Sequence, residues 1–242
     1  MSNPGKIHRD NRVRKAERET STAINGFHPV IDIGDSWDVL DLSKGYDPQA
    51  ISLDPPSIGR YNERRTSMYT TGLFGGVRNI HMGLDIWVPE ETPIRAFADG
   101  KVLFFRDNDN PGDYGPTIIT EHEIGPEHTL YSRCTQAPAR NSGHGEDIGQ
   151  NEPEKIVLYA LFGHLTRTSL GKVAEGMHLK RGDVFAEVGG PHENGGWVPH
   201  LHFQLSWERP SEPDMPGVVA PEDHERALRT YPDPRLVLGN LY

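Results

Sequence analysis

The segment WVPHLHFQLSW, residues 197–207, places two histidines inside a run of bulky apolar residues. Successive side chains of a β-strand point to opposite faces, so residues two apart share a face. The polar side chains at alternate positions from His200 to Ser206 therefore share one face, and the apolar side chains from Leu201 to Trp207 share the other. We expect a strand that buries its apolar face in the core and presents two imidazoles together on the opposite face.

The composition of the whole chain favours an all-β protein. Of its 242 residues 35% are hydrophobic, and 26 glycines and 20 prolines are typical of a turn-rich chain. We predict an all-β fold with an irregular N-terminal extension and short peripheral helices. The formal net charge of −10 disfavours a nucleic-acid or anionic-membrane partner, because like charges repel.

No apolar run approaches the roughly 20 residues that a transmembrane helix needs, and the N-terminal residues do not have the pattern of a signal peptide. The single cysteine, Cys134, excludes an intrachain disulfide. These features predict a cytoplasmic protein, with export by another route left open. Oligomeric state is not indicated by the sequence.

Four segments are expected along the chain. Residues 1–26 are polar and charged, which predicts a disordered or helical arm. Residues 27–77 hold short apolar pieces broken by Pro, Gly and Asp, which indicates an irregular lead-in packed on the core. The strand-like runs lie in residues 78–208, and residues 209–242 form a C-terminal tail with one short helix.

Three local signals refine this organisation. The dipeptide Asp99-Gly100 within residues 92–105 predicts a tight hairpin of two strands. Residues 125–154 are polar and rich in turn-forming residues, which indicates a long surface excursion. Residues 221–230 begin with Pro-Glu-Asp, which favours the short helix of the tail.

A second group of polar residues lies upstream, where His81 and Asp85 are four residues apart. Gly83 between them argues against a helix, so we expect a loop or strand end that turns both side chains to one point. Imidazole and carboxylate are both good Zn²⁺ ligands. With one histidine of the 200–202 pair they make three protein ligands, and three ligands with an open fourth position are typical of a catalytic zinc site. We predict one Zn²⁺ per chain.

The order of the motifs resembles the lysostaphin-type (LytM-like) zinc metallopeptidases, which cut peptide bonds in bacterial peptidoglycan. The resemblance covers roughly residues 78–207. Any single motif is a weak signal, but six in the same order are a strong one. The motifs are HMGLD from residue 81, TPIRAFADGKV from residue 92, YGPTIITEH from residue 114, LYALFGHL from residue 158, MHLKRGDVFAEVGG from residue 177 and PHLHFQL from residue 199.

The resemblance implies a mainly antiparallel, sandwich-like β-sheet of the duplicated hybrid motif type, with the metal at the floor of a narrow groove. It implies zinc ligation by His81, Asp85 and His202, catalytic roles for His164 and His200, and a peptide or muropeptide substrate. The chain departs from the family where a small, glycine-rich approach to the PHLHF motif is usual, because bulky Trp197 stands there. His122 matches the family's strand histidine and is interpreted as structural.

Zinc lowers the pKa of its bound water toward about 7, so a metal-activated water is the expected nucleophile for peptide hydrolysis. The sequence contains no H-E-x-x-H motif, in which Glu is the base. A histidine is therefore the expected general base, since its ordinary pKa is near 6.5. We assign this role to His200 and assign oxyanion stabilisation or proton donation to His164, and the sequence leaves open an exchange of the two roles.

Two other interpretations compete with a zinc endopeptidase. Two histidines and one carboxylate also describe the facial triad of non-haem Fe(II) oxygenases, although that arrangement would leave two histidines without a role. A non-catalytic module that binds a peptide or a partner on the same fold is the main alternative. All five key positions are filled, which favours the peptidase.

Overall fold

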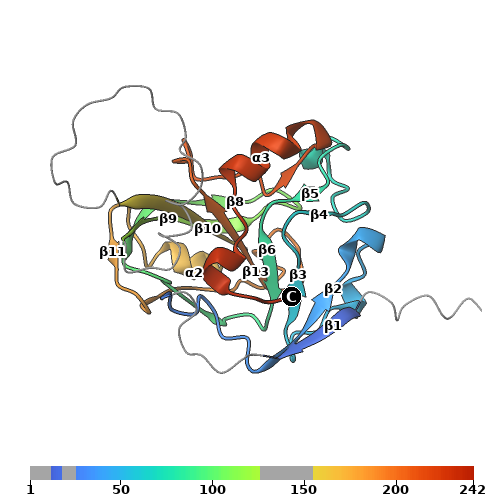
Figure 1. The fold of residues 1–242 in the computed structure, drawn as a ribbon, viewed down its shortest axis with the longest axis horizontal. Coiled ribbons are helices and arrows are strands. Elements are labelled where there is room, and N and C mark those ends of the chain that lie inside the picture. Colours follow the sequence, from blue (N-terminus) through green and yellow to red (C-terminus); the bar gives the residue numbers. More distant parts are fainter. Residues whose placement is uncertain (1–11, 18–25, 126–154) are drawn as a thin grey trace, which may run out of the picture.

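The computed structural model describes residues 12–17, 26–125 and 155–242. Most of its strands belong to one large sheet, and short helices lie at its periphery (Figure 1). The predicted mainly antiparallel all-β class is confirmed. The strands of the large sheet are β1 (Arg12–Glu17), β2 (Ser36–Leu40), β3 (Ser57–Gly59), β6 (Leu84–Trp87), β8 (Gly100–Asn108), β9 (Gly115–Ile124), β10 (Ile156–Gly163), β11 (His178–Leu179) and β13 (His200–Ser206).

Within the described residues, the strand order of this sheet is β1-β2-β3-β6-β13-β10-β9-β8-β11. Neighbours pair antiparallel, except β2 and β3, which pair parallel. A three-stranded and a two-stranded sheet accompany the large sheet. The three-stranded sheet contains β4 (Glu63–Arg64), β5 (Ile80–His81) and β14 (Val218–Val219), and the two-stranded sheet contains β7 (Pro93–Arg95) and β12 (Val184–Glu187).

The helical elements are short. The helix predicted over residues 221–230 is confirmed as a 3₁₀ turn that continues into α3, and Pro221 occupies an early position of that turn, where proline leaves no hydrogen bond unmade. The helical elements are η1 (Leu42–Lys44), η2 (Pro48–Ala50), η3 (Gly72–Phe74), α2 (Arg167–Leu170), η4 (Pro221–Asp223), α3 (His224–Thr230) and α4 (Arg235–Leu238).

Strand β13 lies near the middle of the large sheet, between β6 and β10. The predicted alternation is confirmed, because Leu201, Phe203 and Leu205 belong to the main hydrophobic core. The histidine face is also buried, since all seven residues of β13 are buried. The lead-in packs on the same core, to which Trp37 contributes a fully packed indole.

Two local predictions differ from the structure. The hairpin predicted around Asp99-Gly100 is wrong, because β7 pairs with β12 while β8 pairs with β9 and β11. The turn instead joins two sheets. The Asp99 carbonyl accepts a hydrogen bond from the His122 ring, and the Asp99 carboxylate accepts one from the Arg181 backbone.

The N-terminal arm also differs from its prediction where it is described. Residues 12–17 form strand β1, not a helix, and pair with β2. Without β1 the backbone groups on that side of β2 would be unpaired, and an unpaired sheet edge favours the addition of a strand. The rest of the arm and the excursion predicted after residue 125 lie outside the described residues.

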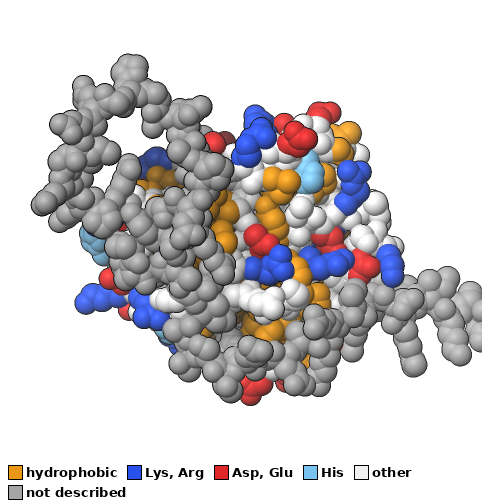
Figure 2. Space-filling view, in the orientation of Figure 1, with side chains coloured by type: hydrophobic (Ala, Val, Ile, Leu, Met, Phe, Trp, Pro, Cys, Tyr) orange, Lys and Arg blue, Asp and Glu red, His pale blue; other side chains and the backbone are white. Residues whose placement is uncertain are grey.

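Charges of both signs lie close together on the surface. On the face drawn in Figure 2, Lys and Arg side chains of the described residues lie beside Asp and Glu side chains. The net charge of −10 is therefore not gathered into one acidic patch on the described part of this face. Among all the residues that the structure describes, no helix has the length and apolar character needed to cross a membrane.

Candidate metal centre

The register of the large sheet places two predicted ligands directly opposite each other. His202 on β13 pairs with Asp85 on β6. On the strands that flank this pair the facing residues are glycines. Gly163 on β10 pairs with His202, and Gly59 on β3 pairs with Asp85. The third ligand, His81, ends β5 in the neighbouring small sheet. The side chains thus converge where the two sheets meet.

The three side chains bring one ligand atom each to a common point. His81 Nε2 lies 3.3 Å from Asp85 Oδ1, and His202 Nδ1 lies 3.0 Å from the same oxygen. The two nitrogens are 3.1 Å apart. A tetrahedral zinc ion with bonds of about 2.0–2.1 Å has neighbouring ligand atoms about 3.3–3.4 Å apart. The observed triangle therefore fits a zinc ion after an adjustment of a few tenths of an ångström.

Hydrogen bonds from the outer ring nitrogens fix the orientation of both predicted histidine ligands. His81 Nδ1 donates to the Arg60 carbonyl at 3.2 Å, and His202 Nε2 donates to Gln204 Oε1 at 3.1 Å. A carbonyl oxygen only accepts, so in the neutral form of either ring the proton lies on that outer nitrogen. The inner nitrogen then carries the lone pair, which is the form that binds a metal.

The carboxylate of Asp85 is ionised although it is buried. Burial by itself would raise the pKa of Asp85, but the nearby His81 and Arg65 side chains lower that pKa well below its usual range. Burial also lowers the pKa of His81, to about 4. The site therefore combines an anionic Asp85 oxygen with a neutral His81 imidazole, and metal binding requires ligands in these protonation states.

The two predicted catalytic histidines lie beside this triangle. The His164 and His200 ring centroids are 4.1 Å apart, and His200 Nε2 lies 3.9 Å from Asp85 Oδ1. His200 Nδ1 donates to the Val198 carbonyl and His164 Nδ1 to the Asn194 carbonyl, each at 2.8 Å. In both neutral rings Nε2 is therefore unprotonated and able to accept a proton.

Burial keeps both of these rings neutral near pH 7. It lowers the pKa of His200 to about 4. Burial also lowers the pKa of His164 well below its ordinary value, and the nearby His200 and His202 rings lower it further. Because the His164 and His200 rings are so close, a proton on one disfavours a proton on the other.

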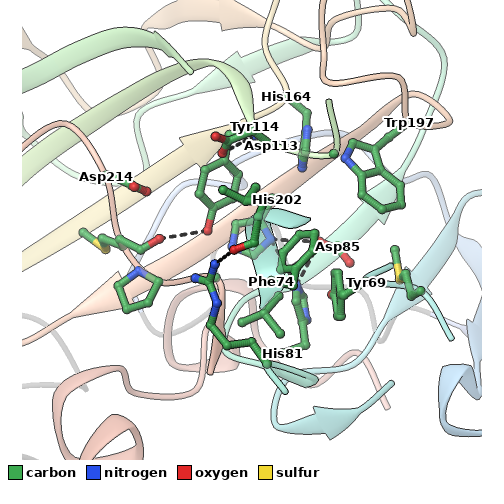
Figure 3. A pocket seen from close by; sticks show the side chains of 18 of the residues that line it. Tyr69, Phe74, His81, Asp85, Asp113, Tyr114, His164, Trp197, His202 and Asp214 are labelled. Carbon is green, nitrogen blue, oxygen red and sulfur yellow. Dashed lines mark hydrogen bonds and ion pairs between the residues drawn. The ribbon is translucent and has the colours of Figure 1, made fainter. Parts of the chain in front are cut away.

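His164 has an unusual backbone conformation, with φ of +62° in the left-handed region. An L-residue with a Cβ atom resists this conformation, at a cost on the order of 1 kcal/mol. Two backbone hydrogen bonds of 2.8 Å hold it, because His164 N donates to the Tyr114 carbonyl and Gly189 N donates to the His164 carbonyl. The imidazole of this residue lies in the pocket that the other predicted site residues line (Figure 3).

All five predicted site residues line one pocket, and Figure 3 labels His81, Asp85, His164 and His202 among its lining residues. Trp197, identified from the sequence as a departure from the family, lies on one side of it, and Asp214 lies on the other. Tyr69 and Phe74 add aromatic surface to the pocket. Burial and the nearby Asp113 raise the pKa of Asp214 to about 6.

Three residues of the site were not identified from the sequence. Arg65 donates to Asp85 Oδ2 at 2.6 Å, Gln204 orients His202, and Asn194 accepts the hydrogen bond that orients His164. Gln204 was identifiable in principle, because it lies two residues after His202 on the same strand face. Arg65 and Asn194 carry no such signal, since they act from separate loops or sheets.

No family model matches the chain. A stretch of 73 residues is 40% identical to the DD-carboxypeptidase/endopeptidase Mpg of Neisseria meningitidis serogroup B and to that of Neisseria gonorrhoeae. The match covers 29% of this chain and 16% of each relative. The chain thus spans only a small part of the length of these curated relatives.

Solved structures of peptidases are also similar. The catalytic domain of lysostaphin, an antimicrobial peptidase from Staphylococcus simulans, matches over 75% of this chain and 98% of that chain, with 18% identity and a TM-score of 0.37. A zinc-containing peptidase from Vibrio cholerae matches over 52% of this chain and 27% of that chain, with 22% identity and a TM-score of 0.33. The motifs predicted a resemblance to peptidases, and the 73-residue match is to proteins that are named as peptidases.

Proposed function

We propose that this chain is a zinc-dependent metalloendopeptidase that hydrolyses peptide bonds in peptidoglycan-type peptides. The observation that carries the proposal is the triangle of His81 Nε2, Asp85 Oδ1 and His202 Nδ1, whose sides are 3.3 Å or less. The triangle lines a pocket that His164 and His200 also line. The peptidoglycan substrate is supported by the family resemblance alone, because the curated relatives are matched over only 16% of their length.

His81, Asp85 and His202 would hold the metal. When bound, zinc supplies Lewis acidity that makes water a nucleophile near neutral pH and polarises a carbonyl. His200 is assigned as general base, because its Nε2 faces Asp85 Oδ1 at 3.9 Å and a carboxylate stabilises the imidazolium that forms on proton transfer.

His164 is assigned the complementary role to that of the general base. It stabilises the developing oxyanion or donates a proton to the leaving amine. The contact between its ring and that of His200 suits this division, since only one of the two rings readily carries a proton at a time. Both rings are neutral in the resting site, so the proton taken up by His200 is the one that the pair returns to the amine.

The test compares metal content and turnover in three variants. His202→Ala should lose both zinc and activity, because a ligand is removed. His164→Ala and His200→Ala should keep one zinc per chain and lose turnover by about 10²–10⁴-fold, the usual contribution of a general acid or base. His178→Ala is the matched control, since His178 is exposed and lies on β11.

Metal analysis and a peptide-cleavage assay on muropeptides and glycine-rich peptides provide the readouts. If His200→Ala lost the metal and His202→Ala kept it, the ligand assignment would be wrong. Iron instead of zinc in protein purified without chelator would favour the oxygenase interpretation. Stoichiometric zinc without chelator-sensitive cleavage of any peptide would favour a binding module.

A further inference from the structure

The guanidinium of Arg65 contacts the side of Asp85 that faces away from the two histidines. Arg65 Nη1 donates to Asp85 Oδ2 at 2.6 Å, whereas both histidine nitrogens approach Oδ1. The exposed fractions of the two side chains are 0% and 2%. The carboxylate thus has one oxygen held by the protein and one oxygen directed at the candidate metal position.

Other groups hold the guanidinium in this place. Arg65 Nε donates to Glu63 Oε2 at 3.2 Å, and Nη1 also donates to the Tyr69 hydroxyl at 3.0 Å. Nη2 donates to the Arg60 carbonyl at 3.4 Å, the same carbonyl that accepts the His81 hydrogen bond. A planar fork with fixed donors can satisfy these partners together, whereas a lysine ammonium cannot.

Gly59 provides the space for this arrangement. It pairs with Asp85 across β3 and β6, and a Cβ atom added to it would lie 2.8 Å from Arg65 Nη2. The same Cβ would lie 2.7 Å from the Trp87 ring. The sheet therefore lacks a side chain at the position where the guanidinium lies.

We propose that Arg65 is a positioning residue that reserves a single oxygen of Asp85 for the metal. A carboxylate can bind a metal through one oxygen or through both. Holding Oδ2 leaves only Oδ1 available, which keeps the coordination number low and a position open for water or substrate. This inference rests on the metal site of the proposed function.

Arg65 has two effects on zinc affinity, and they are of opposite sign, which makes the proposal testable. A cation so near the site repels zinc, so removing its charge alone would strengthen zinc binding. Losing the positioning of Asp85 would weaken zinc binding, and groups that orient metal ligands typically contribute 10–100-fold in affinity. Arg65→Lys keeps the charge and removes the fork, whereas Arg65→Gln removes both.

The experiment titrates zinc into the metal-free full chain against a chromophoric chelator, and then records the visible absorption of the cobalt(II)-loaded protein. We expect zinc affinity to fall about 10–100-fold in Arg65→Lys and to fall also in Arg65→Gln. The cobalt absorption should weaken in both, because the second oxygen of Asp85 then raises the coordination number above four. Arg209→Gln is the matched control, since its guanidinium pairs with Glu121 at 3.0 Å and Arg209 is not one of the residues that line this pocket.

Affinity at or above that of the wild type in either Arg65 variant, or an unchanged cobalt spectrum, would overturn the proposal. If circular dichroism shows that both variants fail to fold, Tyr69→Phe decides, since it removes one acceptor of the guanidinium at nearly constant volume. Zinc binding by that variant should be several-fold weaker, and wild-type affinity would count against the proposal. A wild-type chain that binds zinc but cuts no peptide contradicts only the proposed function, whereas one that binds no zinc contradicts both.

Discussion

His122 shows how a single buried side chain connects stability to pH. Its ring lies away from the metal centre, where Nδ1 donates to the Asp99 carbonyl at 3.1 Å and Nε2 accepts from the Thr120 hydroxyl at 2.8 Å. The Phe97 ring packs on it at a centroid distance of 4.1 Å. Burial lowers the pKa of His122 to about 4, although the backbone carbonyl of Asp99 opposes the shift. The structural role expected for this residue is consistent with these contacts.

The shift predicts an acid-sensitive free energy of unfolding. An unfolded histidine has a pKa near 6.5, so between about pH 6.5 and pH 4 the unfolded chain binds a proton that folded His122 does not. Stability is therefore full above pH 6.5 and falls as the pH decreases toward 4, by up to about 3 kcal/mol for this group. Denaturant titrations of the metal-free protein at pH 7 and pH 4.5 should show a loss about 2 kcal/mol smaller in His122→Gln. His178→Gln should leave the loss unchanged, and an unchanged loss in His122→Gln would contradict the prediction.

At the scale of elements, the break between β5 and β6 shapes the candidate metal centre. β5 ends at His81 and β6 begins at Leu84. Gly83 in the break lies directly under the ring of His202, because an added Cβ would lie 2.4 Å from that ring. The short connection thus brings two predicted ligands, His81 and Asp85, against the third predicted ligand, His202 on β13.

Gly83→Ala should therefore weaken zinc binding by at least about 10-fold, because the His202 ring must move out of its position. Gly72→Ala is a suitable control, since an added Cβ there meets nothing within 4 Å. Competition with a chromophoric chelator measures both variants. Equal zinc affinity in Gly83→Ala and in the wild type would show that the ring has room to adjust.

Strands, turns and site residues differ in how far the sequence could predict them. The alternation of β13 predicted its two faces correctly, because the period of a strand is a local property. The hairpin at Asp99-Gly100 was wrong, because turn residues do not say which strands pair after the turn. The order of the motifs identified His81, Asp85 and His202, which come together in the structure. Arg65 was missed, because its contact with Asp85 depends on the packing of separate elements.

At the scale of the whole molecule, the candidate metal centre joins distant parts of the chain. His81 and His202 are 121 residues apart, and their nitrogens lie 3.1 Å from each other. The unfolded chain cannot maintain such a cluster, so a metal that binds there binds the folded state preferentially. Metal binding and global stability are therefore linked.

Zinc at about 100 times its dissociation constant should add about 2.7 kcal/mol to the free energy of unfolding. For a chain of this size this corresponds to an increase of about 5–10 °C in Tm. Differential scanning calorimetry with and without zinc tests the expectation, and His202→Ala should show little or no increase. An equal increase in that variant would place the stabilising zinc elsewhere.

The left-handed backbone at His164 has a further consequence for directed evolution. Asparagine and glycine adopt this conformation at lower cost than histidine does. A library randomised at codon 164 and sorted only for heat resistance should therefore become enriched in asparagine and glycine, whereas sorting the same library for peptide cleavage should recover histidine. Deep sequencing of the two sorted pools would show that selection for heat resistance and selection for turnover favour different amino acids at position 164.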